Sequence, residues 1–130
     1  MLKTLAFVFG VVLVVIGLLG FVPAASPNGL LLNIFHVNTA HNVVHLVTGL
    51  AALLAGWGGI SQFTPKLFFQ VFGVIYLLVA LLGFWYGNAP IFNVLANNLA
   101  DSFLHLGIAA VSLFLGFGHC CCDGGVCEKK

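Results

Sequence analysis

The chain has 130 residues, of which 62% are apolar and only 5% are charged, and its formal net charge at pH 7 is +1. The mean hydropathy is +1.18. A water-soluble domain needs charged side chains at roughly a quarter of its positions. This composition therefore excludes a soluble globular domain, gives no basic surface for nucleic acid, and predicts that membrane lipid surrounds most of the protein.

Four apolar runs predict an all-α fold of four membrane-spanning helices. We expect these helices at residues 5–22, 41–60, 67–86 and 99–117, within a single transmembrane domain of residues 1–118. Each run approaches the roughly 20 residues that cross a hydrocarbon core of about 30 Å. Backbone groups in lipid must bond internally, and the alternating pattern of a membrane barrel is absent, so helices are favoured.

One further apolar segment, residues 30–37, is too short to cross the membrane. It follows Pro and Gly residues that break helices. We expect it to form a helix or turn that lies at the membrane interface or folds back onto the bundle.

The sequence also repeats itself. The tetrapeptide at residues 8–11 recurs at 71–74, and the one at 18–21 recurs in the same register at 81–84. Matches continue with a slightly different offset in the following helix of each half. They pair Asn33 with Asn93, Asn38 with Asn98, Ala40 with Ala100 and His45-Leu46 with His105-Leu106.

These matches predict two tandem two-helix repeats. Because a hairpin returns to the side on which it began, the copies would run parallel, related by a pseudo-two-fold axis along the membrane normal. A cleaved signal peptide would have no reason to match an internal helix, so we expect the first run to remain as a helix.

The lysines predict the orientation. Lys3 precedes the first helix, Lys66 lies between the second and third, and Lys129 and Lys130 follow the fourth. These places share one side, and the other two connections contain no Lys. The positive-inside rule therefore predicts that both termini are cytoplasmic and that the protein spans the inner (cytoplasmic) membrane several times.

Polar residues are costly in membrane helices and are therefore informative. They gather where the second and fourth helices begin, in the patterns Asn38-x-x-His41-x-x-x-His45 and Asn98-x-x-Asp101-x-x-x-His105. A spacing of four places the last two members of each pattern on one helical face. Asn38 and Asn98 are structural polar residues that we expect to cap the two helices.

Small residues continue these faces down each helix. They are Gly49, Ala52 and Gly56 in the second helix and Ala109, Ser112 and Gly116 in the fourth. Small residues allow close approach of helix backbones. The pattern predicts that the second and fourth helices turn these faces, with the polar residues at their outer ends, toward one another.

The convergence of His41, His45, His105 and Asp101 has several interpretations. The favoured one is a structural cluster whose members hydrogen-bond one another and hold the bundle together. The alternative is a metal site, because three imidazoles and one carboxylate suit tetrahedral zinc, and nickel or copper accept the same donors. A proton relay and axial ligation of haem by His45 and His105 are less favoured. His36 is expected to be a solvated interfacial side chain.

The C-terminal tail, residues 119–130, contains every cysteine of the chain: Cys120, Cys121, Cys122 and Cys127. The predicted topology places the tail in the cytoplasm, where disulfides are rare. Its thiols are a weak candidate for binding a soft metal or for S-palmitoylation next to a membrane helix, and a plain tail with exposed thiols is favoured over both.

The segment from Phe35 to Gly49 resembles a family of small bacterial and archaeal membrane proteins, domain of unknown function 4383. The resemblance is carried by a pattern of the type HNxxHLxxG in the second helix and one of the type DNxxHLxxG in the fourth. Here Ser102 stands where the second pattern usually has Asn. The resemblance implies a four-helix fold over nearly the whole chain except the tail, and it implies no activity.

Enzyme motifs such as GxSxG and HExxH are absent from the sequence. We therefore expect a non-enzymatic accessory or structural membrane protein, with membrane lipid as its surroundings and other membrane proteins or further copies of itself as partners. A metal-binding protein is the first alternative. A small transporter or channel subunit is the second, since four tightly packed helices leave little room for a pore.

Overall fold

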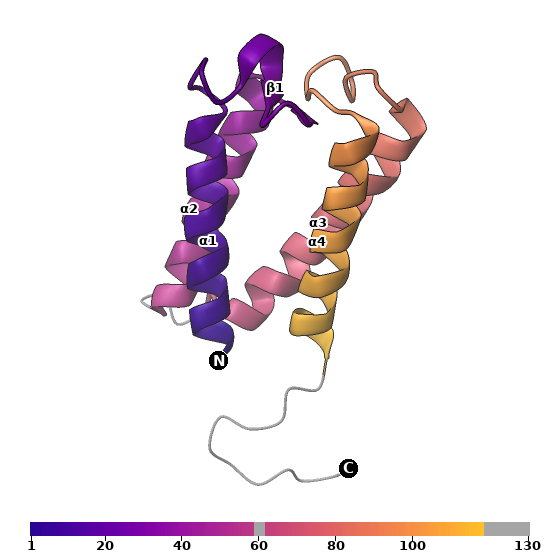
Figure 1. Ribbon diagram of the computed structural model, residues 1–130. Helices are drawn as coiled ribbons and strands as arrows, with labels where there is room; N and C mark the ends of the chain where they lie inside the picture. Colours follow the sequence, from indigo (N-terminus) through magenta and orange to yellow (C-terminus); the bar gives the residue numbers. More distant parts are fainter. Residues whose placement is uncertain (59–61, 119–130) are drawn as a thin grey trace, which may run out of the picture.

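In a computed structural model, which describes residues 1–58 and 62–118, the chain forms a four-helix bundle (Figure 1). The helices are α1 (Leu2–Leu19), α2 (Thr39–Trp57), α3 (Pro65–Tyr86) and α4 (Leu99–Phe117). All four are long and apolar enough to cross a membrane. The prediction of an all-α, four-helix protein is therefore confirmed.

The helix boundaries follow from their caps. The side chain of Asn38 accepts a hydrogen bond from the backbone of His41, so α2 begins at Thr39 and not at residue 41. Thr64 does the same for Leu67, with Pro65 at the first helical position, so α3 also begins two residues early. Gly58, in the left-handed conformation with φ 74°, ends α2 before the expected residue 60. The first helix, α1, begins and ends three residues earlier than predicted, at Leu2–Leu19 in place of residues 5–22.

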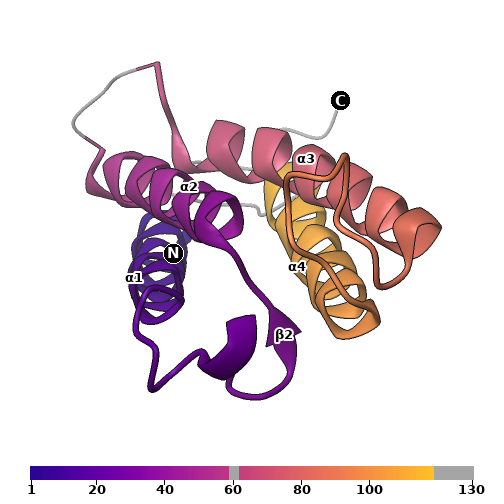
Figure 2. The same ribbon diagram turned by 90° about the horizontal axis from the view of Figure 1, so that it is seen from above.

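The helices associate as two tight pairs, α1 with α2 and α3 with α4 (Figure 2). Glycines make the close contacts within each pair. A Cβ at Gly49 of α2 would lie 2.8 Å from Val14 of α1, and one at Gly116 of α4 would lie 2.6 Å from Gln70 of α3. The expectation that the small-residue faces of α2 and α4 meet one another is therefore wrong, because these faces pack against the preceding helix of the same hairpin.

Aromatic residues of α3 join the two pairs. The ring of Phe9 on α1 packs edge-on against Phe72, with centroids 5.2 Å apart, and against Phe69 at 6.0 Å. Phe68 and Tyr76 extend this row, and Phe68, Phe69, Phe72 and Tyr76 are each at most 4% exposed. The core of the bundle therefore lies where α3 crosses the first hairpin.

Both connections at the end opposite the N-terminus, here called the loop end, contain the same tight turn. After a single 3₁₀ turn at Pro27–Gly29, β1 (Leu30–Leu31) pairs antiparallel with β2 (Phe35–His36). Ile91 and Leu95 form the corresponding bridge in the second connection. Two residues in each turn have positive φ, Leu32 and Asn33 (54° and 60°) and Phe92 and Asn93 (51° and 58°).

Residues 30–37 thus form a turn that folds back onto the bundle, which was one of the two predicted conformations. The other, a helix, is not formed. Consecutive residues with positive φ cannot continue a right-handed helix. The hairpin buries Leu31 and Val37, and Figure 2 shows β2 lying between the two helix pairs.

Reciprocal hydrogen bonds connect the hairpins at the loop end. Asn38 Nδ2 donates to the carbonyl of Val94 at 2.8 Å, and Asn98 Nδ2 donates to the carbonyl of Ile34 at 2.7 Å. Each of these asparagines therefore caps its own helix with its oxygen and holds the opposite turn with its nitrogen.

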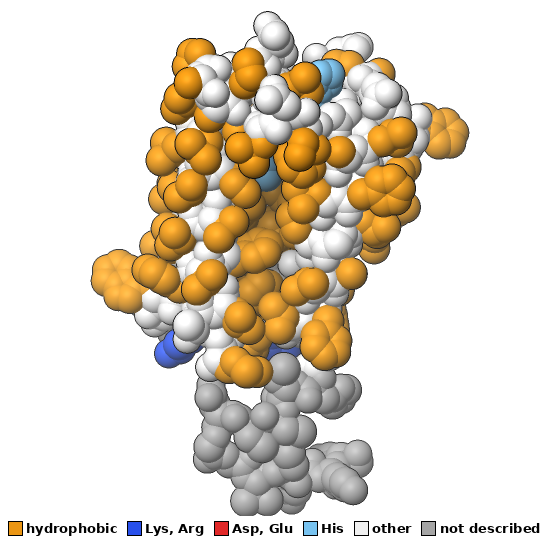
Figure 3. All heavy atoms as spheres, viewed as in Figure 1, with side chains coloured by type: hydrophobic (Ala, Val, Ile, Leu, Met, Phe, Trp, Pro, Cys, Tyr) orange, Lys and Arg blue, Asp and Glu red, His pale blue; other side chains and the backbone are white. Residues whose placement is uncertain are grey.

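The outer surface of the bundle is apolar. Large hydrophobic side chains are exposed along every helix, and they cover the face drawn in Figure 3. Between α1 and α4 that face is hollowed, and a histidine side chain is visible inside the hollow. Lipid is the solvent that such a surface suits.

Candidate functional site

The strongest candidate site is a cluster of three buried histidines near the loop end. His41 and His45 lie one turn apart at the start of α2, and His105 comes from the equivalent turn of α4. One ring nitrogen of each lies within 4.8 Å of the others. The three side chains are 5–6% exposed. We call His41, His45 and His105 the histidine cluster.

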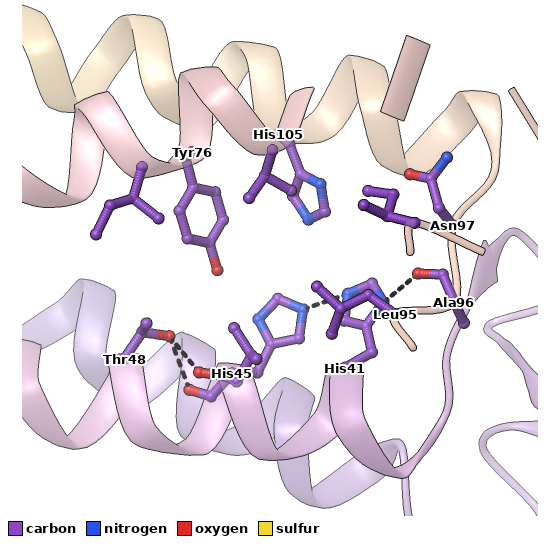
Figure 4. A pocket seen from close by; sticks show the side chains of 12 residues that line it. His41, His45, Thr48, Tyr76, Leu95, Ala96, Asn97 and His105 are labelled. Carbon is purple, nitrogen blue, oxygen red and sulfur yellow. Dashed lines mark hydrogen bonds between the residues drawn. The ribbon is translucent and has the colours of Figure 1, made fainter. Parts of the chain in front are cut away.

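With both rings in the neutral form, hydrogen bonds define the tautomers of His41 and His45. Nδ1 of His41 lies 2.8 Å from the carbonyl oxygen of Ala96, and because a carbonyl only accepts, this nitrogen donates. Nε2 of His41 then carries a lone pair, and Nε2 of His45, 3.0 Å away, donates to it. Both hydrogen bonds are drawn in Figure 4. His41 thereby links α2 to the turn of the opposite hairpin.

The remaining nitrogens of the cluster are poorly satisfied. Nδ1 of His45 and Nδ1 of His105 are buried and have no hydrogen-bond partner in residues 1–58 and 62–118. Leaving a buried polar atom unpaired costs about 1–3 kcal/mol. A purely structural cluster would be expected to pair these atoms, so their isolation is a feature that a function of the site should explain.

Asp101 lies beside the histidine cluster and holds backbone with one of its two carboxylate oxygens. Its Oδ2 accepts two backbone hydrogen bonds, from Asn98 and from His36, each 3.0 Å long. The first completes a capping box at the start of α4, and the second attaches β2 to that helix. Asp101 therefore borders the histidine cluster while its carboxylate holds backbone.

His36 contributes to this arrangement through its backbone N–H, and its side chain is half-buried. Sequence reasoning placed it in solvent and missed the contact. No spacing rule links residue 36 to residue 101, because the contact depends on the tight turn between β1 and β2.

Two cavities flank the histidine cluster, and all three histidines line both. One, of about 60 Å³, lies between α2 and α3 and includes Thr48, Tyr76 and Asn97 in its wall (Figure 4). The other, of about 80 Å³, lies between α1 and α4 and includes Leu13, Asp101 and Ile108. We call them the tyrosine cavity and the leucine cavity. The cluster thus forms the partition between two small spaces inside the bundle.

Sequence reasoning missed Tyr76 and Thr48 as parts of the site. Tyr76 is 3% exposed, and its ring lies edge-on to that of His105, with centroids 5.2 Å apart and planes at 89°. In Figure 4 its hydroxyl points toward Thr48 and His45. The sequence could have predicted Thr48 as part of the site, because it follows His45 by three residues and so lies on the same helical face.

The chemistry of the donors suits a metal ion better than haem. Imidazole is a common ligand of zinc, copper, nickel and iron. A ligating histidine usually donates its other N–H to a carboxylate or backbone carbonyl, as His41 does to Ala96. Organic cofactors occupy pockets of about 300–1,000 Å³, so neither cavity has room for a porphyrin between His45 and His105.

The second candidate site, formed by Cys120, Cys121, Cys122 and Cys127, lies outside the described residues.

The fold and the histidine cluster together define a multi-pass membrane protein with a buried polar centre. The model of the family described as domain of unknown function DUF4383 matches residues 3–118, so the chain belongs to that family, and the resemblance seen in the sequence is confirmed. No curated protein and no solved structure matches the chain.

Proposed function

We propose that this protein binds a divalent transition-metal ion, of the zinc class, through the histidine cluster. The observation that carries the proposal is the convergence of three buried imidazoles, each of which has a ring nitrogen within 4.8 Å of the other two. A bound ion would compensate the cost of burying three imidazoles so close together.

The distances are compatible with small adjustments of the side chains. With zinc–nitrogen bonds of about 2.1 Å, tetrahedral ligand atoms lie about 3.4 Å apart. The Nε2 atoms of His41 and His45 are 3.0 Å apart, and all three candidate nitrogens lie within 4.8 Å. Closure of the site needs His105 to approach the other two rings, and the cavities on either side provide space for that movement.

A structural role is the second candidate, favoured by one specific contact. The hydrogen bond from His41 to Ala96 joins the two hairpins at the loop end, beside the reciprocal bonds of Asn38 and Asn98. In this alternative the protein is a non-enzymatic accessory subunit whose partners are other membrane proteins or further copies of itself.

We also propose that the bundle consists of two tandem parallel repeats with both termini in the cytoplasm, in the cell membrane of its source. The matching turns and the reciprocal asparagine bonds support the repeat. The lysines support the orientation, since Lys3 and Lys66 start α1 and α3 at the same end of the bundle. Trp57 and Trp85, 79% and 86% exposed near opposite ends, suit the two membrane interfaces.

The metal proposal is tested by zinc titration of detergent-purified protein, stripped of metal, followed by calorimetry. The parent is expected to bind one zinc ion per chain, and His45→Ala and His105→Ala are expected to lose that site. The matched control is His36→Ala, which removes a histidine outside the cluster and keeps the backbone N–H that holds Asp101. Equal zinc binding by the parent and both cluster variants would reject the proposal.

A further inference from the structure

The two cavities are counterparts of one another. Residues of α1 correspond to those of α3 with an offset of 63, and residues of the following turn and helix correspond with an offset of 60, as the repeated tetrapeptides and His45/His105 show. Applied to the walls of the tyrosine cavity, these offsets give most of the walls of the leucine cavity. For example, Val79 corresponds to Ile16, and Ile91 corresponds to Leu31.

At several corresponding positions, the tyrosine cavity has a polar side chain and the leucine cavity an apolar one. Tyr76 in one cavity corresponds to Leu13 in the other, and Thr48 corresponds to Ile108. Asn97 corresponds to Val37, although the amide of Asn97 is already bonded to the carbonyls of Gly83 and Gly87. Two hydroxyls are thus present in the tyrosine cavity where the leucine cavity has hydrocarbon, and the polar side chain of the leucine cavity besides the histidines is Asp101, which already holds two backbone N–H groups.

The geometry aims the hydroxyl of Tyr76 at the histidine side of its cavity. The ring packs edge-on to His105, and the hydroxyl points toward His45 and Thr48 (Figure 4). A buried tyrosine hydroxyl usually finds a hydrogen-bond partner. The hydroxyl of Thr48 donates its own proton to the carbonyl of Val44 at 2.7 Å and keeps lone pairs that can accept the proton of Tyr76. A ligand in the cavity would receive the Tyr76 proton by rotation of the tyrosine hydroxyl away from Thr48.

The size and the surroundings of the tyrosine cavity restrict the ligand. A water molecule needs about 10–15 Å³ of such volume, so about 60 Å³ holds a few waters or a molecule with a few non-hydrogen atoms. The wall between the cavity and the outer surface includes Val44 and Ile75, which are 40% and 48% exposed on the apolar face of the bundle. The tyrosine cavity therefore borders the lipid-facing surface of the bundle.

We infer that a small neutral molecule of two or three non-hydrogen atoms binds in the tyrosine cavity, at the open coordination position of the metal ion, with Tyr76 donating a hydrogen bond to it. This inference rests on the proposed metal site. Three protein ligands with a fourth position free are typical of metal centres that bind a small ligand, whereas structural zinc sites are closed by four. Tyr76 acts as a positioning residue and is not a ligand of the metal.

The test uses carbon monoxide as the probe on protein loaded with one equivalent of copper and reduced to Cu(I), for which imidazoles are suitable ligands. Infrared spectroscopy measures the carbon–oxygen stretch, which responds to a hydrogen bond on the bound molecule. The variants are Tyr76→Phe, which removes only the hydroxyl, and Leu13→Ile, its counterpart in the leucine cavity. Copper content is measured on every sample.

The inference predicts a carbon monoxide band in the parent that shifts in Tyr76→Phe, with several-fold weaker binding, and stays unchanged in Leu13→Ile. A band that responds to Leu13→Ile and not to Tyr76→Phe would overturn it by placing the ligand in the leucine cavity. Retained copper without any carbon monoxide band would overturn it while leaving the metal proposal intact. Failure of the parent to retain either zinc or copper at the histidine cluster would overturn the metal proposal and this inference with it.

Discussion

The Nε2 atoms of His41 and His45 lie 3.0 Å apart, on rings whose planes differ by 24°. Because Nδ1 of His41 donates to a carbonyl, the proton between the two rings belongs to His45 when both rings are neutral. A metal ion would take both Nε2 lone pairs, and His45 would then carry its proton on Nδ1. In the proposed metal site, the same pair of atoms that forms a hydrogen bond without metal would supply two ligands to the ion.

Replacement of His105 by leucine separates the metal role from the structural role. The change removes a buried nitrogen that has no partner in the described residues and fills the space with an apolar side chain of similar size. We expect the metal-free variant to melt at or above the temperature of the metal-free parent in detergent. Zinc at about 100 times its dissociation constant should stabilise the parent by about 2.7 kcal/mol and the variant not at all.

A large loss of stability in metal-free His105→Leu would instead favour the structural role. His105→Gln serves as the control for packing, because it keeps a polar side chain at this position. Both variants are compared by fluorescence-monitored thermal unfolding in the same detergent.

Removal of the Asp101 carboxylate should destabilise the fold and spare the metal. Asp101→Ala loses the hydrogen bonds to the backbone N–H groups of His36 and Asn98. Since a hydrogen bond contributes about 0.5–1.5 kcal/mol and two are lost, we expect a clearly lower melting temperature, partly restored in Asp101→Asn. Zinc stoichiometry should stay at one per chain, and its loss in a folded Asp101→Asn protein would show that the carboxylate is a ligand after all.

Close packing at the loop end gives a prediction that is independent of metal. A Cβ at Gly83 would lie 2.5 Å from Ser102 Oγ and 2.9 Å from Asn97 Oδ1. Gly83→Ala should therefore cost about 1–3 kcal/mol of stability, and the added Ser102→Ala change should recover part of it. Gly107→Ala is the control, because a Cβ there meets nothing within 4 Å, and a similar loss in that variant would contradict the packing shown here.

The proposed orientation is tested by fusions after residue 118 and within the connection at Asn88. A fluorescent protein at the first position should fluoresce in bacterial cells, because it would remain in the cytoplasm. Alkaline phosphatase inserted at the second position should be active, because it would be exported. The reverse result would place both termini on the outer side and refute the positive-inside argument for this chain.

Much of the fold follows from local rules that a sequence displays. Apolar length predicts four helices, and the spacing of four predicts that His41 and His45 share a face, which the structure brings together with His105. Helical spacing decides which residues share a face and leaves open which neighbour that face meets. For this reason the sequence could not show whether Gly49 packs against Val14 of α1, as it does in the structure, or against α4.

The candidate site was predicted less completely, for a related reason. A carboxylate at the third position of a helix can cap that helix or point into the bundle, and the sequence does not decide between these uses for Asp101. The structure adds a contact of the Asp101 carboxylate with a backbone amide of β2, which is supplied by a turn in which Leu32 has positive φ. Leucine is rare in that conformation, so neither the turn nor the bond of Asp101 to β2 was predictable.

The most direct test of the metal site is the metal content of the protein as purified in detergent, without chelator and without a histidine tag, by plasma mass spectrometry. The parent is measured beside a variant that ends at residue 118 and lacks the cysteines, and beside the double variant His45→Ala/His105→Ala. We predict near-stoichiometric metal, such as zinc, in the first two proteins and none in the third. Metal that disappears with the tail, or no metal in any of the three proteins, would contradict a metal site formed by the histidine cluster.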